Sequence, residues 1–159
     1  MNERSVSHNT FTIERTYPTS PQRTFAAFSD PVKKRRWFAE GEGFDIDAFE
    51  MDFRIGGTER VTFRAPNGAV YVNHTVYQDI VRDQRIVLAY TMGSAEHRIS
   101  ASLSTFEFLP TGKGAKLIFT EQAAFFEHAD GPKMREEGWS KLLDQLGAEL
   151  ARTIRSERT

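Results

Sequence analysis

The sequence predicts an α+β fold, in which a curved antiparallel sheet of about seven strands surrounds a long C-terminal helix. Six consecutive strand-like segments lie between residues 48 and 126, and their short links force neighbouring strands to be antiparallel. An amphipathic segment at residues 132–155 predicts the long helix. Two segments that begin near prolines, at residues 21–28 and 31–38, predict two short helices after the first strand.

The composition limits the possible functions and locations. The 159 residues suffice for one domain with a substantial core. The net charge of −1 gives no electrostatic reason to expect nucleic acid as a partner. The chain has no Cys, and no apolar run approaches the ~20 residues of a membrane-spanning helix. We therefore expect a cytoplasmic protein without a cofactor, with residues 1–9 disordered, residues 10–155 forming the domain and residues 156–159 frayed.

The first strand and the two short helices follow from local signals. Residues 11–17 alternate apolar and polar side chains, which is typical of a strand. Pro21 suits the first turn of the first helix, while Asp30 and Pro31 suit the N-cap and first position of the second. The second helix ends near Trp37, and a loop is expected from there to residue 47.

Turn residues separate the strands of the central sheet. Asn67 and Gly68 form a strong hairpin signal because both tolerate positive φ. Gly56 and Gly57 predict a tight turn or a bulge. The predicted strands are residues 48–55, 58–64, 69–80, 85–92, 98–108 and 115–126.

The C-terminal helix carries one continuous apolar stripe. The stripe runs from Trp139 through Leu143 to Leu150, and polar residues that include Glu137 and Glu149 take the other side. A helix over residues 132–155 is about 36 Å long. It must lie along a large apolar surface, for which the concave face of the sheet is the only candidate. We expect a ligand cavity between this helix and the sheet.

One carboxyl side chain stands on an apolar strand face. Glu121 alternates with Leu117 and Phe119 and therefore points toward the core. The structural interpretation is a buried carboxylate paired with an arginine or a backbone amide. The functional interpretation is an acid of the cavity with a raised pKa, which makes Glu121 the best single candidate for chemistry. We expect pairing to outweigh desolvation at this carboxyl.

Two other groups have both a structural and a functional interpretation. Trp37 and Phe38 either pack the short helices onto the sheet or form a lid over the cavity. Asp52 and Arg54, on one face of a predicted strand, either form an ion pair or place Arg54 at the cavity rim, where it binds a carboxylate or phosphate.

The serines of the 98–108 strand suggest unfilled volume. Ser102 and Ser104 share a strand face with Phe106, so the serines point inward if Phe106 does. The alternative is a solvent face with a bulge near Thr105. The sequence shows no nucleophile motif or phosphate-binding loop, and its four His residues lack metal-ligand spacing.

Several motifs in this order resemble the helix-grip proteins of the START-like superfamily, also called SRPBCC or Bet v 1-like. Within it, the chain is most similar to the single-domain branch named after the activator of Hsp90 ATPase homologue. The resemblance covers roughly residues 10–152. The matching motifs are residues 25–31 with Trp37, 52–57, 85–92, 119–122 and 138–146.

The resemblance implies binding of a small hydrophobic or amphipathic molecule in the cavity. It also places the Tyr71 and Tyr77 face of their strand inward and His74 outward. Two alternatives remain, a polyketide-cyclase-like enzyme that uses Glu121 as general acid or base with a tyrosine as donor, and a chaperone-associated interaction module. The residues expected to line the cavity are Trp37, Phe38, Phe53, Arg54, Phe63, Tyr71, Tyr77, Tyr90, Ser102, Ser104, Phe106, Phe119, Glu121, Trp139 and Leu143.

Overall fold

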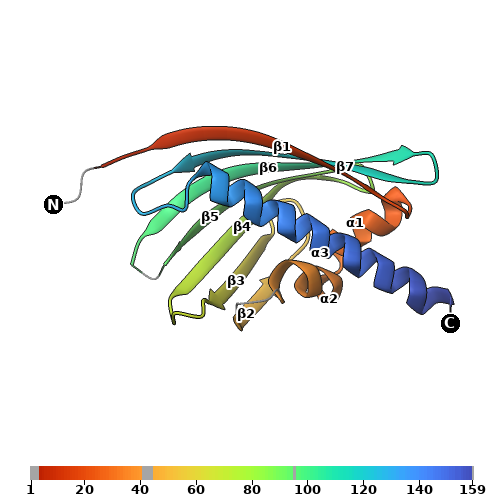
Figure 1. The fold of residues 1–159 in the computed structure, drawn as a ribbon, viewed down its shortest axis with the longest axis horizontal. Helices are drawn as coiled ribbons and strands as arrows, with labels where there is room; N and C mark the ends of the chain where they lie inside the picture. Colours follow the sequence, from red (N-terminus) through yellow and green to blue (C-terminus); the bar gives the residue numbers. More distant parts are fainter. Residues whose placement is uncertain (1–3, 41–44, 95, 159) are drawn as a thin grey trace.

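The computed structural model of the protein describes residues 4–40, 45–94 and 96–158. Seven antiparallel strands form one sheet in the order β1-β7-β6-β5-β4-β3-β2, and the long helix α3 lies across its concave face (Figure 1). The predicted α+β helix-grip fold is confirmed. Its elements are β1 (Ser7–Tyr17), α1 (Pro21–Ser29), α2 (Pro31–Lys34), the π-helical turn η1 (Arg35–Ala39), β2 (Asp45–Met51), β3 (Thr58–Arg64), β4 (Val70–Val81), β5 (Arg85–Ser94), β6 (Arg98–Thr111), β7 (Gly114–Phe125) and α3 (Pro132–Arg158).

The two short helices begin as the sequence predicts. The side chain of Ser20 caps α1 and that of Asp30 caps α2, and a proline follows each cap. Trp37 in η1 is buried, and its Nε1 donates a hydrogen bond of 2.8 Å to the carbonyl oxygen of Ala27. The ring of Trp37 also packs against Phe28, which fixes η1 onto α1.

Several strand boundaries differ from the prediction. β2 begins at Asp45, within the predicted loop, rather than at residue 48, and β6 continues to Thr111 rather than ending at residue 108. β1 begins at Ser7, which is paired with Phe125, so the sheet includes residues that we expected to be disordered. β2 ends at Met51 rather than at residue 55, and the backbone turns before β3. This turn places Gly56 at φ +83°, a conformation that glycine adopts without strain. Residues 41–44 of the predicted loop lie outside the described ranges.

Helix α3 supplies one wall of the core. Leu143 and Leu146 are 0% exposed, and the ring of Trp139 packs at a tilt against that of Phe119, with ring centroids 4.5 Å apart. The predicted apolar stripe is confirmed, but Glu149 is buried rather than on the polar side, because it forms an ion pair with Arg36 of η1. Among the described residues, no helix is both long and apolar enough to cross a membrane.

Candidate functional site

A row of polar side chains crosses the inner face of the sheet. The strand register places Glu59 of β3 beside Thr75 of β4, Thr75 beside Tyr90 of β5, and Tyr90 beside Ser102 of β6. Neighbouring strands are about 4.8 Å apart, so these side chains form one continuous row. All four are buried, each no more than 6% exposed. Polar groups at this depth need partners, and two hydrogen-bonded clusters provide most of them.

The first cluster is built around Glu121 of β7, whose side chain is 0% exposed. Its Oε1 accepts hydrogen bonds of 2.7 Å from Tyr90 Oη and 3.1 Å from Ser104 Oγ. Its Oε2 lies 3.9 Å from Nη1 of Arg135, which is an ion pair but too long for a hydrogen bond. The prediction that Glu121 is buried and paired is confirmed.

Arg135 of α3 connects the helix to this cluster. Its guanidinium donates to both carboxylate oxygens of Asp130, at 2.9 and 2.8 Å, and to Ser100 Oγ at 2.8 Å. Its Nη1 donates to Tyr90 Oη at 3.1 Å, and Trp139 Nε1 donates to the same oxygen at 3.3 Å. Tyr90 Oη therefore accepts hydrogen bonds from two side chains of α3 and donates one to Glu121, which links the helix to the sheet.

Burial dominates the electrostatics of the first cluster. Desolvation raises the pKa of Glu121, and the hydrogen bond from Tyr90 and the charge of Arg135 offset only part of that rise. Our expectation that pairing would outweigh desolvation was wrong, because the guanidinium of Arg135 is hydrogen-bonded to Asp130 instead. Burial also raises the pKa of the Tyr90 hydroxyl, and the Glu121 charge adds to this.

Two buried polar atoms of this region have no hydrogen-bond partner among the described residues. Ser102 Oγ and Glu121 Oε2 are buried, and no hydrogen-bond partner for either lies within the described ranges. Ser104, next to Glu121 across the β6–β7 ladder, is two residues from Ser102, so both atoms belong to one part of the inner face. Buried polar atoms nearly always form a hydrogen bond, so these two can accept one from a polar group that enters here.

The second cluster lies at the other end of the polar row. Lys34 of α2 donates to Glu59 Oε1 at 3.1 Å, and Tyr77 Oη donates to the same oxygen at 2.8 Å. The three residues are at most 3% exposed. The ammonium of Lys34 also lies 4.5 Å from the ring centroid of Phe38, a favourable cation–π distance. The cluster fastens α2 to the sheet.

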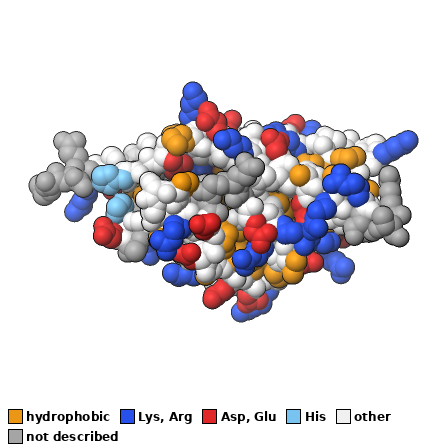
Figure 2. Space-filling view, turned by 60° about the horizontal axis from the view of Figure 1, so that its bottom comes forward, with side chains coloured by type: hydrophobic (Ala, Val, Ile, Leu, Met, Phe, Trp, Pro, Cys, Tyr) orange, Lys and Arg blue, Asp and Glu red, His pale blue; other side chains and the backbone are white. Residues whose placement is uncertain are grey.

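Beyond the polar row, the inner face is only partly covered. Phe63 and Tyr71 stack with centroids 5.7 Å apart, and both are half-buried, as are Asn73 and Met92 in the next row. The inward orientation of the tyrosine face of β4 is confirmed by the burial of Tyr77. Figure 2 views the molecule from below the orientation of Figure 1, and apolar side chains reach the surface there in separate patches between charged ones.

The structure divides the remaining predicted residues among several environments. Phe38 and Phe53 are half-buried at the edge of the core. Arg54 lies in the turn after β2, not on a strand, and forms an exposed ion pair of 2.7 Å with Asp52, as in the structural interpretation. Six predicted residues lie in the core or the first cluster: Trp37, Ser102, Phe106, Phe119, Trp139 and Leu143. Whether they line a cavity stays a prediction.

Sequence reasoning missed the charged residues of both clusters. Arg135 precedes Trp139 by four positions, so it continues the apolar stripe of α3 on the same helix face. Glu59 alternates with Val61 in β3, which is the same signal that identified Glu121. Lys34 precedes Trp37 by three positions. Within the described part of the chain, no group of three or more His, Asp or Glu side chains could hold a metal ion.

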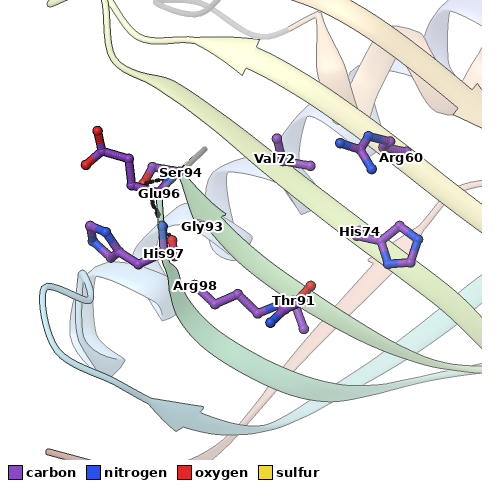
Figure 3. A pocket seen from close by; sticks show the side chains of 9 residues that line it. All are labelled: Arg60, Val72, His74, Thr91, Gly93, Ser94, Glu96, His97 and Arg98. Carbon is purple, nitrogen blue, oxygen red and sulfur yellow. Dashed lines mark hydrogen bonds between the residues drawn. The ribbon is translucent and has the colours of Figure 1, made fainter. Parts of the chain in front are cut away.

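A cavity of about 510 Å³ lies on the opposite, outer face of the sheet (Figure 3). Its lining includes His74, which points outward as predicted but is half-buried rather than fully exposed. None of the residues expected to line the inner cavity belongs to it.

Comparison with known proteins places the chain in a family. Residues 18–151 match the family described as Activator of Hsp90 ATPase homolog 1-like protein. A protein of Rhizobium leguminosarum shares 38% identity over 95% of this chain and 99% of its own, with a TM-score of 0.91. One from Rhizobium loti shares 49% identity over 91% and 99%, with a TM-score of 0.84. An Aeromonas hydrophila protein of the same family shares the fold, at 17% identity, 91% and 94% coverage and a TM-score of 0.72. No curated protein matches.

Proposed function

Since the chain belongs to the Activator of Hsp90 ATPase homolog 1-like family, we propose that it binds a small amphipathic molecule on the inner face of the sheet, beside the N-terminal half of α3. The family and the helix-grip fold are compatible with such a ligand-binding domain. The observation that carries the proposal is a pair of buried polar atoms, Ser102 Oγ and Glu121 Oε2, that have no hydrogen-bond partner among the described residues and lie in a largely aromatic core.

The arrangement around these atoms suits a ligand with one polar end. Ser102 and Glu121 would hydrogen-bond its polar group, because each offers an acceptor and Ser102 also offers a donor. The half-buried rings of Phe63 and Tyr71 and the side chain of Met92 would contact its apolar part. Polar recognition would thus come from β6 and β7, and apolar contact from β3 to β5.

An enzyme that uses the same face is the second candidate. The observation that favours it is the raised pKa of Glu121, whose Oε1 is fixed by the Tyr90 hydroxyl. A buried carboxyl group with a raised pKa can act as a general acid or base toward a bound carbonyl compound. If the protein is an enzyme, the Glu121→Gln variant should still bind the ligand but should lose the pH-dependent rate of the reaction. A rate that is unchanged in this variant excludes Glu121 as the acid or base.

A fluorescence titration with N-phenyl-1-naphthylamine, an uncharged apolar probe, tests the proposed site. Ser102→Phe places a ring beside Tyr90 and Ala123 on the inner face, so it should weaken probe binding. Leu103→Phe is the matched control, because Leu103 is the next residue of β6 and is 38% exposed on the outer face.

We expect Ser102→Phe to bind the probe about tenfold more weakly, a loss of about 1.4 kcal/mol of binding free energy. Leu103→Phe should bind it as the wild type does. Circular dichroism and a denaturation curve of each variant confirm that it is folded. Equal affinity in both variants, or loss of binding in Leu103→Phe alone, would place the probe elsewhere and remove the support for this site.

A further inference from the structure

The cavity on the outer face of the sheet has a basic lining. The nine residues around it include Arg60, Arg98, His74 and His97, against the single carboxylate of Glu96. Figure 3 shows Glu96 at the hairpin end, with its carboxylate directed away from Arg98 and Thr91. The volume of the cavity, about 510 Å³, falls within the usual range of small-molecule sites.

The strand register explains how these side chains come together. Arg60 of β3 lies opposite His74 of β4, and His74 lies opposite Thr91 of β5. The neighbouring row joins Val72 of β4, Gly93 of β5 and Arg98 of β6. The two arginines therefore stand at opposite sides of the cavity, separated by three interstrand spacings or about 14 Å.

A β-bulge turns Arg98 into this cavity. Met92 pairs with Ser100 but Gly93 pairs with Arg98, so Ile99 is an extra residue in β6. Without the bulge, Arg98 would share the inward direction of Ser100. A Cβ at Gly93 would lie 2.5 Å from the carbonyl oxygen of His97, so only glycine permits this close approach of the two strands.

Among the residues that the structure describes, the side chains of Arg60 and Arg98 have no partner. None of the hydrogen bonds or ion pairs within the described ranges involves the side chain of Arg60, Arg98 or His74. Glu50 lies opposite Arg60 on β2, yet no ion pair joins the two in that part of the chain. By contrast, four arginines on or beside the sheet lie within 3.4 Å of a carboxylate, namely Arg15, Arg54, Arg64 and Arg85.

We propose that this outer-face cavity binds a small soluble anion that carries phosphate or carboxylate groups. Arginine holds both groups through charge-assisted hydrogen bonds, and Arg60 and Arg98 would hold the ligand from two sides. The Thr91 hydroxyl can add a hydrogen bond. The site is on the opposite face from the inner polar row, so it does not depend on the function proposed above.

An NMR titration of ¹⁵N-labelled protein with inorganic pyrophosphate, and separately with citrate, tests this site. Ionic strength is kept at about 30 mM because exposed charges are screened at higher salt. We expect saturable shifts of the backbone amides of Val72, His74, Thr91 and Gly93 with at least one of the two anions. A response to pyrophosphate alone identifies a phosphate ligand, a response to citrate alone a carboxylate ligand, and each supports the proposal.

Variants distinguish this site from general attraction of anions. Arg60→Gln and Arg98→Gln should each weaken binding about tenfold, which corresponds to one charge-assisted hydrogen bond. Arg85→Gln is the control, because Arg85 is exposed on β5 but pairs with Asp79 at 2.7 Å outside the cavity. The amide spectra confirm that each variant is folded. The absence of saturable shifts with both anions, or an equal loss in Arg85→Gln, would overturn the proposal.

Discussion

The ionisation of Glu121 should make the stability of the protein depend on pH. Its carboxyl group is 0% exposed, and burial raises its pKa above the ordinary value of 4.5. Between that value and the folded-state pKa, the unfolded chain holds fewer protons than the folded protein. Stability from this group is therefore fully present below about pH 4.5 and is lost as the pH rises through the folded-state pKa.

The size of this effect follows from proton linkage. One group contributes a slope of about 1.4 kcal/mol of unfolding free energy per pH unit inside this window. Glu121→Gln keeps the shape of the protonated carboxyl but cannot ionise. We compare the unfolding free energies of the two proteins. The value for wild type minus the value for Glu121→Gln should decrease as the pH rises and should level off above the folded-state pKa.

Urea denaturation of the two proteins from about pH 4 to about pH 8 measures this difference. Glu137→Gln is the control, because Glu137 is exposed on α3 and belongs to neither of the two polar clusters. We expect it to change stability by less than about 0.5 kcal/mol at every pH. An NMR titration should give the Glu121 carboxyl a pKa above 4.5. Parallel stability curves for wild type and Glu121→Gln would refute the reasoning.

Two further substitutions test the packing of the helices on the sheet. Leu143→Ala removes a side chain that is 0% exposed and should cost about 2–5 kcal/mol, while Met134→Ala, at a side chain 63% exposed, should cost less than about 0.5 kcal/mol in the same urea series. Lys34→Met leaves the carboxylate of Glu59 buried without its cation and should cost about 3–5 kcal/mol. Adding Glu59→Leu should recover much of that loss, and no recovery would contradict the ion-pair account.

The buried face of a helix or a strand could be predicted from the sequence. The stripe from Trp139 to Leu150 follows from helical periodicity, which is a local property. Alternation left two directions open for Ser102, and the structure shows that its side chain is buried. The position of Glu121 also follows from alternation. The end of β2 did not follow, because the turn after Met51 depends on how the chain folds back onto β3.

The partners of the buried charges could not be predicted in the same way. Arg135 is 14 positions after Glu121 in the sequence, but its guanidinium lies 2.8 Å from Asp130 and 3.9 Å from Glu121. Because Arg135 pairs mainly with Asp130, burial has the larger effect on the pKa of Glu121. The basic lining of the outer face depends on the bulge at Ile99, which reverses the direction that simple alternation assigns to Arg98. Both features arise from register and side-chain geometry between elements, not from a local sequence pattern.

Native mass spectrometry of the protein purified from its own host tests the central claim most directly. The claim is that the inner face, at Ser102 and Glu121, holds a small amphipathic molecule. The account predicts an added mass on the wild-type protein that is retained by Leu103→Phe and lost from Ser102→Phe. An added mass that Ser102→Phe retains, or bare protein in all three spectra, would contradict it.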